Sequence, residues 1–188
     1  AAGAPGPAQR GTGRVARFAT ADHYQPLRAA LAAVADRLTA AGHRSEPLCD
    51  DARLSDRAAA VRAGIGWRGK NTMVLAPGVG PWVLLGTVVT DAQLPVSEPT
   101  SRTCGSCSAC LPACPTGALV APGVLDARRC LAAIAQQPGA IPRQSRRTLP
   151  VRPYGSDVCL AAWRPGGRLL RSSTERRGRV DLTAVLDA

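Results

Sequence analysis

The chain has 188 residues, of which 45% are hydrophobic and 3% aromatic, so a single domain, or a domain with a small module, must build its core from Ala, Val and Leu. No apolar run reaches the roughly 18 residues that a membrane span needs, and the segment Ala1 to Gly13 lacks the apolar stretch of a signal peptide, so we expect a cytoplasmic protein. The formal net charge of +11 is compatible with a polyanionic partner such as RNA, although arginine-rich surfaces are often only solvated.

The first predicted element is a helix over residues 22–42. Asp22 can cap its start, Pro26 suits its first turn, and Gly42 can end it. Its apolar side chains recur at the helical period as one stripe, formed by Leu27, Leu31, Val34 and Leu38.

Shorter elements are predicted next. A short strand is expected over residues 43–50, and a second helix is expected from its cap, Ser55, to Ala63, with Gly64 as its stop. Strand-like runs then cover residues 72–75 and 82–90, on either side of a turn-rich connection.

After Leu94 the composition shifts toward Pro, Ser and Thr. The segment P-T-G-A-L suits the opening of a helix, Asp126 can cap a helix that carries Cys130, and Cys159 is expected near another short helix. Residues 136–155 indicate an extended basic connection, and the chain from Pro165 onward is rich in arginine and turn residues.

Seven cysteines in a chain without a secretory signal indicate metal or redox chemistry. Cys104, Cys107, Cys110 and Cys114 follow the spacing C-x2-C-x2-C-x3-C-P, which is typical of four-iron clusters. Thiolates at this spacing let one tight loop bind three irons, while the fourth cysteine serves a second cluster. Zinc sites usually have two separated pairs of ligands, so zinc is the weaker interpretation.

From about Arg14 onward the sequence resembles the epoxyqueuosine reductase family, the cobalamin- and iron–sulfur-dependent enzymes of queuosine tRNA modification. The resemblance rests on motifs in the family's order: A-R-F-A-T-A-D-H-Y-Q-P-L, G-I-G-W-R-G-K-N-T, L-G-T-V-V-T-D-A-Q-L-P, C-G-S-C-S-A-C-L-P-A-C-P-T-G-A, L-D-A-R-R-C and Y-G-S-D-V-C. It covers the middle of a family member, so we expect a truncated and partly degenerate one that lacks the start of the corrinoid domain and the C-terminal helical repeats.

The resemblance implies an α+β protein in which a corrinoid-binding body of α/β type precedes a ferredoxin-like 4Fe-4S module. The expected boundaries are a linker over 1–13, a partial corrinoid-binding domain over 14–96, the iron–sulfur domain over 97–166 and the start of a C-terminal region over 167–188.

The resemblance also implies site residues. Asp50 matches the acid that protonates the substrate, although from the residues alone Asp50 and Asp51 could equally be a helix cap and a solvated neighbour. His23 and Tyr24 match a family pair in reversed order. The loop beside the corrinoid is matched by Gly66, Trp67, Gly69, Lys70, Asn71 and Thr72, where glycines let the backbone approach a flat ligand.

The cluster ligands depart from the family pattern, because Ser156 and Trp163 stand at cysteine positions and Arg164 replaces a proline. The family's crossed arrangement leaves each cluster three thiolates, from Cys104, Cys107 and Cys110 for one and from Cys114, Cys130 and Cys159 for the other. Three alternatives follow: Ser156 ligates through oxygen, a cluster has three irons or an exogenous ligand, or the clusters are unstable. Cys49, far upstream, is expected to be a small buried hydrophobe.

The implied function is the reduction of epoxyqueuosine to queuosine in a tRNA anticodon loop, by a monomer that takes electrons from an external donor. The alternatives are an iron–sulfur electron-transfer module without a corrinoid, and an inactive truncated relative. Two arginine groups could contact tRNA phosphates or be solvated charge: Arg143, Arg146, Arg147 and Arg152, and Arg164, Arg168, Arg171, Arg176, Arg177 and Arg179.

Overall fold

The structure is a computed structural model that describes residues 12–139, 141, 154–163 and 179–181. Helices and short strands are mixed along the chain, which confirms the expected α+β class. The chain divides into two compact units: unit 1 is Ala1–Ala21, Ala109–Val120 and Leu125–Ala188, and unit 2 is Asp22–Ser108 and Ala121–Val124. Within the described ranges, no helix combines the length and apolarity needed to cross a membrane.

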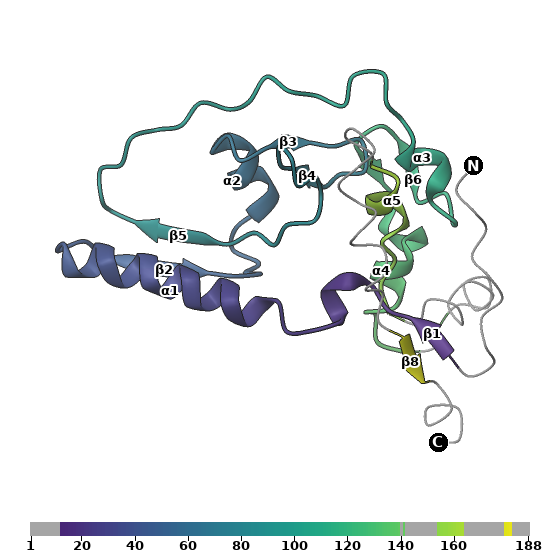
Figure 1. Ribbon diagram of the computed structural model, residues 1–188, viewed down its shortest axis with the longest axis horizontal. Coiled ribbons are helices and arrows are strands. Elements are labelled where there is room, and N and C mark those ends of the chain that lie inside the picture. Colours follow the sequence, from purple (N-terminus) through teal and green to yellow (C-terminus); the bar gives the residue numbers. More distant parts are fainter. Residues whose placement is uncertain (1–11, 140, 142–153, 164–178, 182–188) are drawn as a thin grey trace. The chain divides into compact units, whose positions relative to one another are not determined.

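The longest helix of unit 2 is α1, Tyr24–Ala40 (Figure 1). The Asp22 carboxylate accepts hydrogen bonds from the backbone amides of Tyr24 and Gln25, both at 3.0 Å, so it caps the helix as expected. At the other end Gly42 has a φ of +90°, which lets the His43 amide bond back to the Leu38 carbonyl at 3.0 Å.

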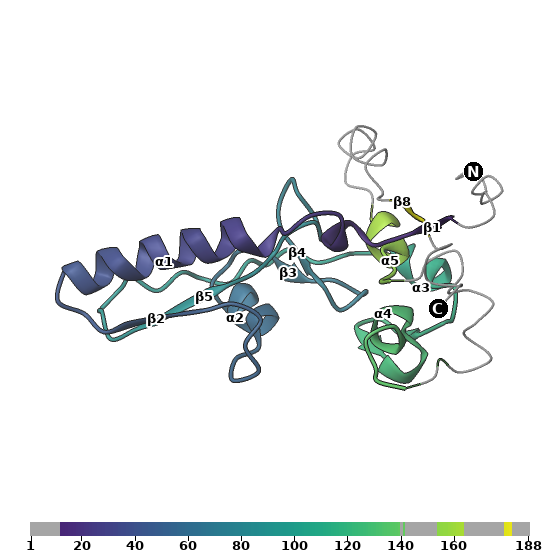
Figure 2. The ribbon, with the colours of Figure 1, turned by 90° about the horizontal axis from the view of Figure 1, so that it is seen from below.

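The predicted apolar stripe of α1 is wrong at one position. Val34 is 50% exposed, whereas Ala35 is only 6% exposed. Both residues follow Leu31 at helical spacing, three and four positions later. Helix α1 packs against the strands β2 and β5 and runs beside them in both ribbon views (Figures 1 and 2). The close approach to these strands favours the smaller side chain at the contact.

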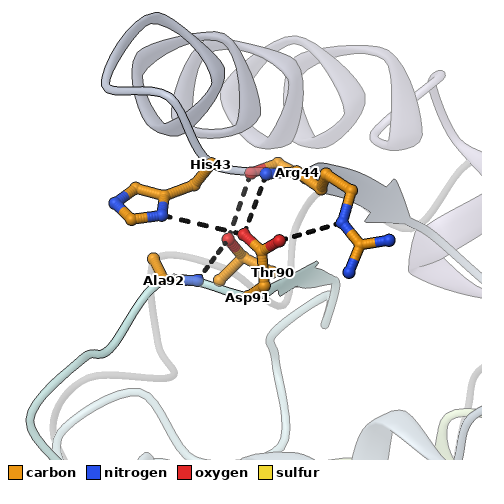
Figure 3. Close-up of polar contacts among 6 residues, drawn as sticks. His43, Arg44, Thr90, Asp91 and Ala92 are labelled. Carbon is orange, nitrogen blue, oxygen red and sulfur yellow. Dashed lines mark hydrogen bonds and ion pairs between the residues drawn. The ribbon is translucent and has the colours of Figure 1, made fainter.

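Strand β2, Ser45–Leu48, pairs antiparallel with β5, Thr87–Thr90, so the predicted strands over 43–50 and 82–90 are both shorter than expected. Their register is fixed beyond the strand ends by Asp91 (Figure 3). The Asp91 carboxylate accepts from the Arg44 amide and from Arg44 Nε, each at 2.9 Å, and His43 Nδ1 lies 3.7 Å from it.

Helix α2, Asp56–Arg62, follows Ser55, whose side chain makes no capping bond although its position was predicted correctly. Gly64 ends the helix with a φ of +71°, and a Cβ there would lie 2.4 Å from the Glu98 carbonyl oxygen. The helix packs against a second antiparallel pair, β3, Trp67–Arg68, and β4, Val74–Leu75.

The predicted strand over 72–75 begins only at Val74, because Thr72 has a φ of +69°. The sequence does not predict strand β3, because two residues between glycines are too few to show an alternation of apolar and polar side chains. The buried apolar part of unit 2 consists of aliphatic residues, as the composition predicts: Ala35, Leu48, Ala60, Val74, Leu75 and Ala76.

Unit 1 begins with β1, Thr12–Arg14, which pairs antiparallel with β8, Arg179–Asp181. A 3-10 turn, η1, Arg17–Ala19, follows. The Ala16 amide bonds to the Tyr154 carbonyl at 2.9 Å, and the rings of Phe18 and Tyr154 lie 5.5 Å apart. The sequence predicted none of these pairings.

The cysteine-bearing part of unit 1 contains four short helical elements: α3, Cys110–Ala113, η2, Ala127–Arg129, α4, Leu131–Ile134, and α5, Val158–Ala161. Leu131 and Ile134 form its buried core. The helix expected at Cys159 is confirmed as α5.

Two expectations for this part are wrong. The segment P-T-G-A-L leads into a strand, because Gly117 turns the chain with a φ of +57° and β6, Leu119–Ala121, pairs with β7, Val124–Leu125. Asp126 caps η2 through the Arg128 amide at 3.1 Å, so Cys130 lies between η2 and α4 rather than inside one helix. Most of the predicted basic connection and of the arginine-rich segment lies outside the described residues.

Candidate functional site

Asp50 lies two residues beyond the end of β2, exposed and with a φ of +56°. Aspartate tolerates this left-handed conformation better than most residues, and such outliers are often found at functional sites. Asp50 and Cys49 lie close enough to Tyr24 to affect its ionisation. Partial burial is the main cause that raises the pKa of Tyr24, and the charges of Asp50 and Cys49 add to it. Tyr24 begins α1, the helix that packs against β2, and Asp50 follows β2.

Asp51 has different surroundings from its neighbour. Arg53 donates from Nε to one Asp51 oxygen at 2.9 Å and from Nη2 to the other at 2.7 Å, and it also contacts Glu46 at 2.7 Å. The hydrogen bond from the Arg53 side chain is the main cause that lowers the pKa of Asp51 to about 2. Asp51 is therefore ionised at neutral pH and is unsuited to donate a proton. Within the described ranges Asp50 makes no ion pair.

His23 is exposed at the start of α1, where its side chain does not cap the helix, because Asp22 has that role. The structure places His23 next to Tyr24 in the chain.

Of the predicted corrinoid loop, Gly66 precedes β3 and Trp67 lies in it, while residues 69–72 form a tight turn between β3 and β4. The Gly69 amide bonds to the Met73 carbonyl at 2.8 Å, and the Thr72 amide bonds to the Gly69 carbonyl at 2.9 Å. Asn71 and Thr72 are 5% and 6% exposed, and the Asn71 side chain accepts from the Met73 amide at 3.2 Å. The turn thus uses the buried Asn71 side chain to hold its own shape.

The glycines of this loop are required by contacts within the chain. A Cβ on Gly66 would lie 2.3 Å from the Leu75 carbonyl oxygen, and one on Gly69 would lie 2.5 Å from Asn71 Oδ1. By contrast, the indole Nε1 of Trp67 is buried and finds no hydrogen-bond acceptor among the described residues. A buried donor without a partner is costly, so Trp67 fits a site where a bound ligand supplies the acceptor.

The first two cysteines of the run, Cys104 and Cys107, lie in unit 2. Cys104 Sγ accepts a hydrogen bond from the Lys70 backbone amide at 3.4 Å, and the Cys107 amide bonds to the Cys104 carbonyl at 3.1 Å. Amide donors to cysteine sulfur stabilise thiolates and are typical of iron–sulfur sites. The Cys107 side chain is exposed.

The other four cysteines of the predicted set lie in unit 1, where Cys110 opens α3 and Cys114 follows it. Burial opposes the thiolate of Cys114. Two kinds of hydrogen bond to the sulfur outweigh this burial and lower the pKa of Cys114. The Thr116 hydroxyl lies 3.6 Å from the sulfur, and the Ala118 backbone amide lies 3.2 Å from it.

Cys159 in α5 is the most strongly perturbed thiol. Burial is the main cause that raises the pKa of Cys159 to about 11, and the neighbouring thiols of Cys114, Cys130 and Cys110 raise it further. Helix α5 packs against α3, which carries Cys110. Three thiols are thus near enough to disfavour a negative charge on Cys159, an arrangement that fits an iron site binding these cysteines as thiolates.

In the part of the chain that the structure describes, no three His, Cys, Asp or Glu side chains converge on one metal ion. In a four-iron cluster each thiolate binds a different iron. None of the seven cysteines, all of which lie in described ranges, forms a disulfide.

The two substituted ligand positions flank α5. Ser156 precedes the helix and Trp163 follows it, and both are half-buried. An indole nitrogen is only a hydrogen-bond donor, so Trp163 cannot replace a thiolate, whereas the Ser156 hydroxyl retains an oxygen that could bind iron.

Sequence reasoning assigned Lys70 only to the corrinoid loop and missed its contact with the cysteine run. Lys70 Nζ donates to the Gly105 carbonyl at 2.9 Å and to Ser108 Oγ at 3.1 Å. Lys70 and Cys104 are 34 positions apart in the chain, so no local sequence pattern could have indicated the hydrogen bond between the Lys70 amide and the Cys104 sulfur.

Comparison with known proteins agrees with this geometry. The family model of a 4Fe-4S double cluster binding domain matches residues 103–162, which confirms the expected iron–sulfur module. The chain is 43% identical over 112 residues to an epoxyqueuosine reductase of Bacillus anthracis, covering 60% of this chain and 30% of that protein. It is 41% identical over 140 residues to an epoxyqueuosine reductase of Bacillus subtilis, covering 73% of this chain and 36% of that protein.

The fold is also similar to a crystal structure of an epoxyqueuosine reductase with an epoxyqueuosine-modified tRNA-Tyr stem loop. The TM-score is 0.77 at 37% identity, over 84% of this chain and 43% of that one. The chain spans about a third of the length of the curated relatives that it matches.

Proposed function

We propose that this chain, which is a relative of the epoxyqueuosine reductases, reduces epoxyqueuosine to queuosine in a tRNA anticodon loop with cobalamin and iron–sulfur clusters as cofactors. The observation that carries the proposal is a combination of two features in one chain: cysteines gathered where α3 packs against α5, and Asp50 following β2, the strand against which the helix of Tyr24 packs. A simple electron carrier has no need of the second feature. A tRNA substrate would place the reaction in the cytoplasm.

The cysteines would hold the clusters. Cys104, Cys107 and Cys110 would bind one, and Cys114, Cys130 and Cys159 the other. When bound, the clusters accept single electrons from an external donor, at potentials that net charge, hydrogen bonds to sulfur and solvent exposure determine. The protein supplies amide donors to two of these sulfurs, from Lys70 to Cys104 and from Ala118 to Cys114.

Cobalamin would lie against the turn between β3 and β4. Trp67 supports this assignment, because its buried Nε1 lacks an acceptor, and Tyr24 with His23 would border the same site. When bound, cobalamin supplies a strongly reducing metal centre, and the protein supplies orientation and exclusion of water. Two contacts of Lys70 Nζ leave its ammonium able to donate a third, as to a phosphate group.

Asp50 would supply the proton. Conversion of an epoxide to an alkene takes up an electron pair and two protons, and the oxygen leaves as water. We assign the proton on the leaving oxygen to Asp50 because Arg53 binds both oxygens of the Asp51 carboxylate and disfavours its protonation. Tyr24, whose pKa is raised, stays protonated and can donate a hydrogen bond to the Asp50 carboxylate or to the substrate.

The test is anaerobic turnover of epoxyqueuosine-containing tRNA by the reconstituted protein with cobalamin and a low-potential reductant. Asp50→Asn is expected to reduce turnover by roughly 10²- to 10⁴-fold, the usual contribution of a general acid. Iron content and tRNA binding should be unchanged. Asp36→Asn, which removes an exposed carboxylate on α1, is the matched control and should retain activity. Equal turnover by the Asp50 and Asp36 variants would contradict the role of Asp50.

A second candidate is an iron–sulfur electron carrier without a corrinoid. The loop geometry favours it in one respect, because Gly66, Gly69 and Asn71 are all occupied by contacts within the turn. Corrinoid retention during anaerobic purification discriminates the two functions. Retention that Trp67→Phe weakens would support the reductase, and no retention at saturating cobalamin would support the carrier.

A further inference from the structure

Lys70, the single lysine of the chain, makes four hydrogen bonds within unit 2. Its amide donates to Cys104 Sγ at 3.4 Å, and its carbonyl accepts from the Gly123 amide at 2.8 Å. Its ammonium donates to the Gly105 carbonyl at 2.9 Å and to Ser108 Oγ at 3.1 Å. Lys70 therefore contacts the cysteine-bearing segment 104–108 with both its backbone and its side chain.

The backbone that carries Lys70 is held firmly. Its neighbours close the turn between β3 and β4 through amide–carbonyl bonds, and Arg57 Nη1 in α2 donates to the Thr72 carbonyl at 3.2 Å. Asn71 and Thr72, which follow Lys70, are both buried. The Lys70 amide is thus presented to Cys104 by a rigid element, whereas segment 104–108 has no helix or strand of its own.

The two residues that accept hydrogen bonds from the Lys70 ammonium are each next to a cysteine of the run. Gly105 and Ser108 each follow a cysteine of the run directly, Cys104 and Cys107 respectively. A positive charge and an amide donor beside a cysteine-bound cluster stabilise the reduced state, which carries more negative charge, so both raise the reduction potential.

We propose that Lys70 is a positioning and tuning residue for the cluster that Cys104 binds. It holds segment 104–108 in the ligating conformation before iron is present, and its ammonium raises the potential of the bound cluster. Because Trp67 lies in β3, directly before this turn, Lys70 would also link the proposed cobalamin loop to the electron-supplying loop. The tuning part rests on the proposed iron–sulfur function, and the ordering part does not.

Reconstituted protein under anaerobic redox titration, monitored by EPR, tests the tuning. Lys70→Gln and Lys70→Met should both shift the midpoint potential of one cluster signal to a more negative value, whereas Lys70→Arg, which retains the charge, should restore it. Arg37→Gln removes an exposed charge at the end of α1 and is the matched control, with no shift expected. A Lys70→Gln protein with the wild-type potential would overturn the tuning.

Hydrogen–deuterium exchange on the iron-free full chain tests the ordering without any cluster. Lys70→Met should increase deuterium uptake at residues 103–108 by at least severalfold in rate, while uptake in α1 stays unchanged. Unchanged uptake at 103–108 would overturn the ordering. If the wild-type protein binds no iron, the proposed function fails, and the exchange result still decides whether Lys70 orders the segment.

Discussion

At the scale of single residues, the two consecutive aspartates after β2 differ because only one has an arginine partner. Arg53 contacts Asp51 through its backbone amide and two side-chain nitrogens, and it also reaches Glu46. Asp50 adopts a left-handed backbone conformation and affects Tyr24 instead. Adjacent carboxylates therefore have separate roles, one structural and one proposed as a proton donor.

Arg53→Gln should raise the pKa of Asp51 from about 2 toward its ordinary value of 3.8, because the guanidinium hydrogen bond is its main perturbation. Because the pKa of Asp51 is lower in the folded than in the unfolded protein, its ionised form stabilises the fold at pH values above 3.8. This contribution to stability is lost as the pH falls from 3.8 to about 2. Carboxyl NMR titration of both proteins measures the shift. An Asp51 pKa near 2 in the variant would contradict this cause.

At the scale of elements, the hairpin of β3 and β4 depends on close backbone approach at Gly66. A Cβ there would lie 2.3 Å from the Leu75 carbonyl oxygen, which cannot move as a flexible side chain could. Gly66→Ala should therefore destabilise unit 2 by roughly 1–3 kcal/mol, the usual cost of overpacking. Urea unfolding followed by circular dichroism measures it.

Gly78→Asn is the matched comparison for that experiment. Gly78 has a φ of +75°, but a Cβ there would meet nothing within 4 Å, and asparagine tolerates the left-handed region. The substitution should cost less than about 1 kcal/mol. Equal destabilisation by both substitutions would mean that the Gly66 contact is not what limits the hairpin.

The ends of α1 could be predicted from the sequence because their signals are local. Asp22 and Gly42 act within a few residues of the helix ends, and both have the expected roles. The pairs β3–β4, β6–β7 and β1–β8 could not be predicted. Their strands have two or three residues, too few to show a period, and β1 and β8 are far apart in the chain.

The candidate site was predictable to a similar degree. The spacing of the first four cysteines alone indicated an iron–sulfur site, because ligand spacing is a local property. Asp50 and Tyr24 were predicted only through a family resemblance, since their proximity depends on how β2 and α1 pack. The contact between Lys70 and Cys104 was missed for the same reason.

At the scale of the whole molecule, the net charge of +11 should make tRNA binding sensitive to salt. With about three phosphate contacts and a slope of about 0.7 per contact, a fourfold rise in salt reduces the affinity roughly 20-fold. Filter binding of tRNA at about 50 and 200 mM salt measures this. An affinity that stays constant would mean that the arginines do not contact phosphates.

The central claim is that the cysteine run binds iron–sulfur clusters despite Ser156 and Trp163. Its most direct test is anaerobic reconstitution followed by iron and acid-labile sulfide determination with EPR. Equal amounts of iron and sulfide are expected, about four of each per chain if one cluster forms and about eight if both do, with a sharp loss in Cys104→Ser. Near-zero iron and sulfide in the wild-type protein, with all cysteines reduced, would contradict it.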